Sequence, residues 1–276
     1  MSETNKKLTE NIIAGKLRPD AEDKVIPIQS VEYNKLPPGF PSGLKTLDDM
    51  FDGGFREGQL IIISGLSGYG KTEMSIQMTH SYSKQAIPVL FISYEMTLKE
   101  LQDRFRRIGN YDDLLCYVPK KNISDNIKWL EDKIVESITF YNTKVVFIDE
   151  LSSITVDTKT NEADLVMQRR IVGMLKRITL EHNITIILNV HVHKLDEGKE
   201  PRMQNIYGTG DSYKLAHAVI FVHRLKEKVG RGEQALKFTN ESKIIVDKNR
   251  LTGKLGQFKV LFKDNKFSLI DNFREE

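Results

Sequence analysis

The sequence predicts an α/β fold in which a mainly parallel central sheet is flanked by helices, with antiparallel strands at the C-terminal end. Short apolar runs recur along the chain, and segments with helical periodicity separate them. Strands buried on both faces are apolar throughout, and parallel strands need crossover helices between them. Near the C-terminus, IIVDK, FKVLF and FSLID follow one another closely, as is typical of antiparallel strands joined by turns.

Two strand–helix pairs come first in the folded part. QLIIIS at 59–64 is a predicted strand, followed by a glycine-rich turn and a helix over about 71–84. VLFIS at 89–93 is the second predicted strand. The helix after it carries apolar residues on one face at spacings of three and four, namely Leu98, Leu101, Phe105 and Ile108.

Three further strands complete the predicted parallel part. VVFID at 145–149 precedes a long helix from about residue 162, and TIILNV at 185–190 and AVIFVH at 218–223 follow. The core face of the long helix carries Leu165, Ile171, Val172, Leu175 and Ile178.

Composition excludes several classes of protein. The 276 residues are 39% hydrophobic and 29% charged, with a formal net charge of +3, which does not by itself argue for nucleic acid. The single cysteine, Cys116, excludes an internal disulfide framework and a cysteine-rich zinc site. There is no run of about 18 apolar residues and no apolar signal-peptide core, so we expect a cytoplasmic protein with no membrane partner.

The N-terminal segment differs from the rest of the chain. Residues 1–35 mix charges with few apolar side chains, which predicts an arm or linker with at most one short helix, near residues 12–17. Prolines 37, 38 and 41 then mark the start of a folded domain over 36–276.

Residues 65–72 read GLSGYGKT, a complete G-x-x-x-x-G-K-T between a predicted strand and a predicted helix. Glycines let the backbone wrap closely around phosphate, and the amides and the helix N-terminus then face the anion. Lys71 is expected to neutralise the β- and γ-phosphates, and the Thr72 hydroxyl to bind Mg²⁺. We expect ATP, or another nucleoside or deoxynucleoside triphosphate, to be bound by Gly65, Ser67, Gly68, Gly70, Lys71, Thr72 and Glu73.

A carboxylate at the end of a neighbouring strand completes such a magnesium site, and Asp149 at the end of VVFID is predicted to take this place. Hydrolysis also needs a group that orients or deprotonates the attacking water. Glu95 follows the second strand and Glu150 follows Asp149, so both are expected at the ligand-binding edge of the sheet. The residue pattern alone leaves both as candidates for the base.

Six motifs occur along the chain in the order GLSGYGKT, YEM, VVFIDE, NVHVHK, IYGTGDSYKLAHAVIFVHR and KNRLTGKLGQF. Over about residues 40–272 this order resembles the DnaB-type replicative helicases, in particular the helicase halves of phage primase–helicases and of the mitochondrial helicase Twinkle. The resemblance implies a RecA-like P-loop NTPase fold and a helicase motor domain over 36–276. The KNR tripeptide and a histidine ending the fourth strand are more specific than the P-loop.

The resemblance assigns catalytic roles beside that of Lys71. It implies that Glu95 is the base and that His191, which ends the fourth strand, senses the γ-phosphate. Lys248 and Arg250 of KNR would reach the γ-phosphate bound by an adjacent subunit, so hydrolysis would depend on assembly. The plain alternatives are a core histidine at 191 and a solvated strand face at 248–250. Arg224, taken as another strand end, is a second candidate for an inter-subunit contact.

The resemblance also implies partners: single-stranded DNA, further copies of the chain in a ring of six, and a primase or polymerase, in a bacterial or phage-infected cell. One segment expected to contact DNA, residues 194–204, has equal numbers of acidic and basic side chains and so is not a basic patch. Backbone amides are therefore expected to contribute to DNA binding. The candidate DNA-binding residues are Lys194, Lys199, Arg202, Gly208, Thr209 and Gly210.

Two departures from the family leave alternatives open. No zinc-binding or primase module and no DnaB-type helical N-terminal domain precedes the motor, so we expect either a stand-alone motor or a fragment of a primase–helicase. The competing functions are a RecA-type recombinase, which forms filaments on DNA, and a signalling or clock-type P-loop ATPase with no role on DNA.

Overall fold

The computed structural model describes residues 26–30, 38–120, 124, 126–151, 154, 164–193, 199–206, 213–228 and 236–270. The chain divides into two units, Met1–Leu36 and Pro37–Glu276. In the first unit, the described residues include a short 3-10 helix, η1, at Ile28–Ser30. The helix predicted near residues 12–17 lies outside the described residues.

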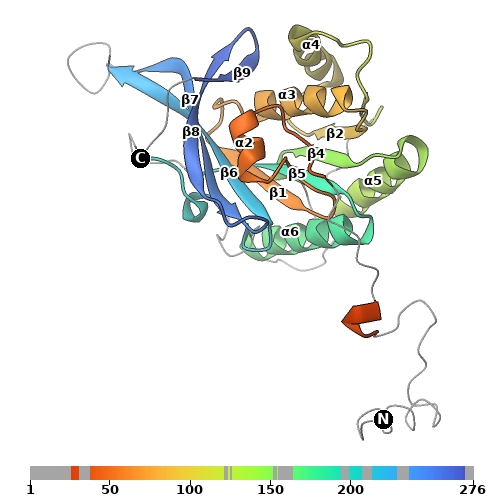
Figure 1. Cartoon of the computed structure of the whole chain (residues 1–276). Coiled ribbons are helices and arrows are strands. Elements are labelled where there is room, and N and C mark those ends of the chain that lie inside the picture. Colours follow the sequence, from red (N-terminus) through yellow and green to blue (C-terminus); the bar gives the residue numbers. More distant parts are fainter. Residues whose placement is uncertain are drawn as a thin grey trace, which may run out of the picture. The chain divides into compact units, whose positions relative to one another are not determined.

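The second unit is built on one mixed sheet with the strand order β3-β2-β4-β5-β1-β6-β7-β8-β9. Pairing is parallel from β3 to β6 and antiparallel from β6 to β9, which confirms the predicted arrangement (Figure 1). The strands are β1 Leu60–Gly65, β2 Val89–Ser93, β3 Cys116–Tyr117, β4 Val145–Asp149, β5 Thr185–His191, β6 Ala218–Lys228, β7 Leu236–Asn249, β8 Gly256–Lys263 and β9 Lys266–Leu269.

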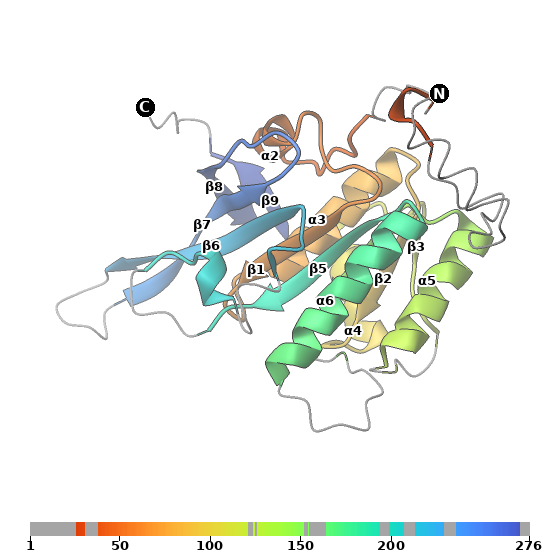
Figure 2. The same ribbon diagram turned by 90° about the horizontal axis from the view of Figure 1, so that it is seen from below.

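Helices cover both faces of this sheet. Figure 1 shows α3 and α4 on one face and α5 and α6 on the other, and Figure 2 looks onto α5 and α6 side by side. The helices are α2 Lys45–Met50, α3 Lys71–Lys84, α4 Leu98–Ile108, α5 Ile127–Tyr141, α6 Asp164–Glu181 and the 3-10 helix η3 Met203–Asn205. None of the described helices combines the length and apolar character that a membrane crossing needs.

Successive residues of the central strands pack into different cores. In β1, Ile61 and Ile63 join the core under α2, α3 and α4, whereas Leu60 and Ile62 join the core under α5 and α6. All four side chains are fully buried, each contributing roughly 1.5–3 kcal/mol of transfer free energy. Burial on both faces explains why the parallel strands read as unbroken apolar runs.

The C-terminal hairpin extends beyond its predicted length. β6 continues to Lys228, and the strand predicted over IIVDK begins as early as Leu236. The added residues are mostly polar, and antiparallel strands exposed to water carry no apolar run. Two predictions are therefore corrected: Arg224 lies within β6 and does not end it, and Arg250 lies in the turn after β7, so it does not alternate with Lys248 on a strand.

Candidate nucleotide site

The predicted phosphate loop connects β1 to α3. Gly70 directly precedes the first residue of α3 and has φ 99°, in the left-handed region that glycine adopts without strain. A Cβ built on Gly70 would lie 2.8 Å from the Phe267 ring of β9, so a side chain there would displace that ring. The loop thus enters α3 in a conformation that depends on glycine, which leaves the N-terminal amides of the helix facing outward.

Lys71 is held inside this loop. Its side chain is buried, and Nζ donates to the carbonyl of Gly65 at 3.1 Å and lies 2.9 Å from Nδ1 of His191. Burial lowers the pKa of Lys71, and the charge of Asp149 partly opposes this. A bound phosphate would supply the negative charge that a buried ammonium needs.

Thr72 and Asp149 meet at the end of β4. Thr72 Oγ1 donates to Asp149 Oδ2 at 2.8 Å, and Asn189 of β5 donates to Oδ1 at 2.8 Å. Asp149 is fully buried, and burial raises its pKa. A hydroxyl and a carboxylate in contact form an oxygen donor set that suits Mg²⁺, and a cation would stabilise the buried carboxylate.

Both candidate bases reach the same imidazole. Nε2 of His191 lies 3.2 Å from Oε1 of Glu95 and also contacts Oε2 of Glu150. Hydrogen bonds first to Glu150 and then to Glu95 raise the pKa of His191 to about 9. The hydrogen bond from His191 lowers the pKa of Glu95 and so keeps it ionised, as a base must be. Glu95 is partly exposed whereas Glu150 is buried, which leaves Glu95 more accessible to a water molecule.

The remaining predicted phosphate ligands differ in their surroundings. Ser67 and Gly68 are exposed at the tip of the loop. Glu73, in the first turn of α3, forms an ion pair with Arg104 of α4 at 2.6 Å. This contact ties α3 to α4 and directs the Glu73 carboxylate at Arg104.

The KNR segment lies at the other end of the sheet. Lys248 Nζ donates to the carbonyl of Lys214 at 2.5 Å, and Arg250 donates to the same carbonyl at 2.7 Å. The backbone N–H of Arg250 donates to His217, whose own N–H donates to Leu60 at the start of β1. Arg250 is therefore level with the start of β1, whereas the phosphate loop follows its end, roughly 16 Å further along the strand.

The candidate DNA-binding residues are only partly described. Arg202 is exposed and pairs with Asp247 of β7 at 3.2 Å, and Lys199 is exposed nearby in the sequence. The other four, Lys194, Gly208, Thr209 and Gly210, lie outside the described residues.

Two site residues, Asn189 and Ser75, were not predicted from the sequence. The amide of Asn189 bonds both Asp149 and the Ser75 hydroxyl of α3, at 2.8 and 3.1 Å, so it holds the carboxylate against the phosphate-loop helix. A polar residue within the otherwise apolar run TIILNV was the available signal. Buried polar groups need partners, and such a residue points to a network.

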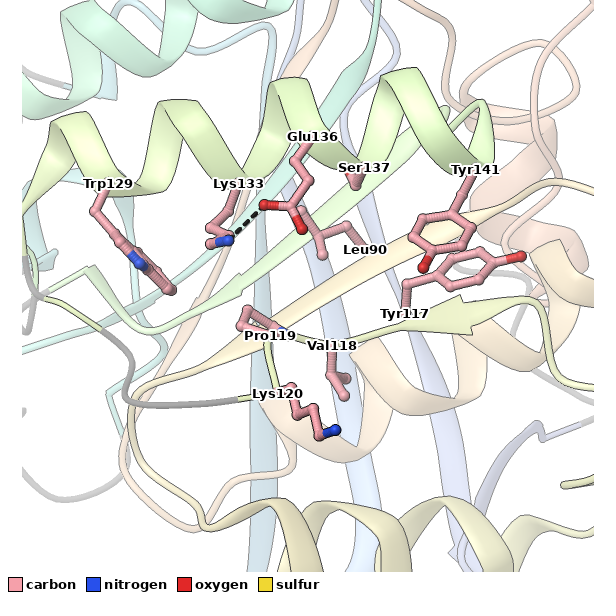
Figure 3. A pocket seen from close by; sticks show the side chains of 10 residues that line it. All are labelled: Leu90, Tyr117, Val118, Pro119, Lys120, Trp129, Lys133, Glu136, Ser137 and Tyr141. Carbon is pink, nitrogen blue, oxygen red and sulfur yellow. Dashed lines mark hydrogen bonds and ion pairs between the residues drawn. The ribbon is translucent and has the colours of Figure 1, made fainter.

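A separate cavity of about 540 Å³ lies between α5 and the segment after β3 (Figure 3). Trp129 and Lys133 of α5 line one wall, and the rings of Tyr117 and Tyr141 stack with centroids 3.9 Å apart at one end. Its lining shares no residue with the nucleotide site described above.

The fold and the phosphate loop together define a RecA-like P-loop domain, a class of domain whose family implies a bound nucleotide. The chain belongs to the AAA domain family, whose model matches residues 34–197. It is similar to a solved ATPase domain, with a TM-score of 0.72, 17% identity and 98% of each chain covered. It is also similar to a DnaB-like replicative helicase whose structure was studied with its primase interactions, with a TM-score of 0.68, 17% identity and coverage of 98% of this chain and 67% of that one.

Curated relatives point in the same direction. The replicative DNA helicase DnaB of Mycoplasma genitalium is 28% identical over 271 residues, which covers 85% of this chain and 57% of that protein. The DNA repair protein RadA of Halalkalibacterium halodurans is 26% identical over 169 residues, covering 61% of this chain and 35% of that protein. The chain thus spans about half or less of the length of these relatives. The predicted resemblance to DnaB-type helicases is confirmed.

Proposed function

We propose that this chain is the motor of a replicative DNA helicase, which hydrolyses ATP or another nucleoside triphosphate to translocate on single-stranded DNA as a ring. The observation that carries the proposal is the contact chain from Lys71 through His191 to Glu95. It couples the phosphate-binding lysine to a candidate base through one imidazole. A site that only bound nucleotide would not need a base such as Glu95 linked to the phosphate-binding Lys71.

Each residue has a role that follows from its place. Lys71 neutralises the β- and γ-phosphates, and Glu95 orients and deprotonates the attacking water. His191 contacts both, so the arrival or loss of the γ-phosphate near Lys71 changes the hydrogen bond that Glu95 receives. Thr72 and Asp149 would hold Mg²⁺, which supplies charge neutralisation at the phosphate oxygens.

Hydrolysis is proposed to take place between subunits. Lys248 and Arg250 lie at the end of the sheet remote from their own phosphate loop, which supports a role at the loop of a neighbouring copy. A ring lets every copy give its basic pair to one neighbour and receive another's. An arginine supplied in this way contributes roughly 10³–10⁵ in rate.

DNA and protein partners belong to the same proposal. Lys199, Arg202 and the segments around 194 and 208–210 are the proposed DNA contacts, and a primase is a further proposed partner because one similar helicase was studied with its primase. We place this activity in the cytoplasm of a bacterial or phage-infected cell. Residues 1–35 remain a proposed arm that precedes the motor.

The second candidate is a recombinase or repair ATPase that forms filaments on DNA. The similarity to RadA proteins supports it. Negative-stain images of the protein with a non-hydrolysable nucleotide and single-stranded DNA separate the two. Closed six-membered rings, together with nucleotide-dependent separation of a forked duplex, support the helicase. Open helical filaments without strand separation would favour the recombinase over the helicase.

A further inference from the structure

Cationic side chains from several elements gather around His217, just before β6. Lys176 of α6 places Nζ 2.6 Å from Nε2 of His217. Lys248 and Arg250 meet on the carbonyl of Lys214, three residues before His217. No carboxylate among the described residues forms a salt bridge with Lys176, Lys248 or Arg250.

The hydrogen bonds of His217 fix where its proton lies. Nδ1 accepts the backbone N–H of Leu60 at 2.9 Å, so a neutral ring carries its hydrogen on Nε2. An ammonium has three donors and no acceptor, and it cannot receive this N–H. A neutral amine can. The contact at Nε2 therefore favours an uncharged Lys176 while the site is empty.

The positive charges around His217 also favour uncharged forms of their titratable neighbours. Burial, followed by the charges of Lys176, Arg250 and Lys248, lowers the pKa of His217 to about 4. Burial and then Arg250, Lys176 and Lys214 lower the pKa of Lys248 to about 8. Burial and Arg250 also lower the pKa of Lys176. An arriving anion would reverse these effects, because it favours the charged form of every neighbour.

In the proposed function, Lys248 and Arg250 meet the terminal phosphate of a neighbouring subunit's nucleotide. Resting on that function, we propose that Lys176 and His217 belong to the same anion site, and that the site takes up a proton when a phosphate group occupies it. The proton comes from solvent and binds Nζ of Lys176. The ammonium then donates to the anion and gives up the hydrogen bond from Nε2 of His217, which stays neutral. The site would thus carry three positive charges, on Lys176, Lys248 and Arg250, when phosphate is bound, and fewer when it is empty.

Inorganic sulfate is a suitable probe, because it exchanges no proton near neutral pH and needs no neighbouring subunit. Calorimetric titration of the Lys71→Ala protein in two buffers with different ionisation enthalpies measures both sulfate binding and proton uptake. Removing Lys71 reduces the contribution of the phosphate loop. We expect sulfate to bind with net proton uptake.

Two substitutions of Lys176, each added to the Lys71→Ala protein, distinguish the effect of the charge on sulfate binding from the effect of proton uptake. Adding Lys176→Arg should keep sulfate binding and lose the uptake, because arginine stays charged. Adding Lys176→Met should weaken sulfate binding several-fold and also lose the uptake. Lys144→Met is the matched control, because Lys144 pairs with Glu57 outside the group, and it should behave like the parent. Circular dichroism confirms that each variant is folded.

Three outcomes would overturn the inference: no sulfate binding in the parent, binding without proton uptake, or undiminished uptake in the folded Lys176→Arg protein. These results are independent of the trans role of Arg250, which the mixing of subunits described below tests. If mixing succeeds and sulfate exchanges no proton, only the inference about Lys176 and His217 is wrong. If mixing fails, the inter-subunit role is wrong whatever sulfate does.

Discussion

Nζ of Lys71 lies 2.9 Å from Nδ1 of His191, and among the described residues this is the only hydrogen-bond contact of Lys71 with another side chain. The two residues come from different elements, α3 and β5, and are brought together because β5 pairs with β1 in register up to Gly65. Lys71 can exchange this contact with the imidazole for a contact with a bound phosphate.

Replacing Lys71 by alanine removes the cation expected to bind the β- and γ-phosphates. We expect hydrolysis to fall by about 10²-fold or more and nucleotide binding to weaken, because oriented charge at the phosphates is a main source of rate. Turnover and circular dichroism measured on the same preparation check this. A folded variant with near-normal turnover would refute the assignment of the phosphate loop.

The two candidate bases are separated by matched amide substitutions. Glu95→Gln keeps the shape and removes the base, so nucleotide binding should persist while hydrolysis falls by roughly 10²–10⁴-fold. Glu150→Gln should do less, because Glu150 is buried and its contact with His191 orients that ring. Single-turnover hydrolysis of both variants gives the comparison. A more severe loss in Glu150→Gln would transfer the role of base to Glu150.

Binding of single-stranded DNA should be independent of sequence and weaken as salt rises. Contacts to backbone phosphates release counterions, and the logarithm of the affinity then falls by about 0.7 per contact for each tenfold rise in salt. Fluorescence anisotropy with two unrelated oligonucleotides at two salt concentrations measures this. Arg202→Ala should weaken both equally. Absence of binding at low salt with a non-hydrolysable nucleotide would favour a P-loop ATPase without a role on DNA.

His217 makes the folded state sensitive to acid. Its pKa in the folded protein is about 4, below the ordinary value of 6.5, so the unfolded chain binds a proton more readily. The stability is fully present above pH 6.5 and is lost as the pH falls toward 4. The free energy of unfolding should therefore fall less steeply in His217→Gln than in the parent between pH 7 and pH 5. Exposed His193→Gln is the control, and equal slopes for parent and His217→Gln would contradict the prediction.

The parallel strands and the phosphate site could be predicted because their signals are local. β1 is an unbroken apolar run, and GLSGYGKT is a contiguous motif that joins β1 to α3. By contrast, β3 has only the two residues Cys116–Tyr117, too few for any periodicity, and α5 buries Ser137 within its apolar face. The contact of Asn189 with Asp149 arises from the pairing of β4 with β5, which neither segment reveals alone.

The position of Arg250 should make hydrolysis depend on assembly. Because Arg250 lies at the sheet end remote from its own phosphate loop, Arg250→Ala should bind nucleotide normally and hydrolyse it about 10³-fold more slowly. Mixing it with the inactive Lys71→Ala protein should restore part of the activity, since an intact loop of one variant can then face an intact Arg250 of the other. Activity of the parent should also rise with protein concentration, because in the proposed mechanism the complete site forms only between subunits.

The control for mixing is the double variant Lys71→Ala with Arg250→Ala, which should restore nothing when added to Lys71→Ala, because no copy in that mixture has an intact phosphate loop. Exchange of subunits is followed separately by energy transfer between labelled copies. If labelled subunits exchange and the mixture of single variants stays inactive, Arg250 does not act across a subunit boundary. Lys248→Ala should give the same pattern as Arg250→Ala, because both side chains donate to the carbonyl of Lys214 and would therefore approach the neighbouring phosphate together.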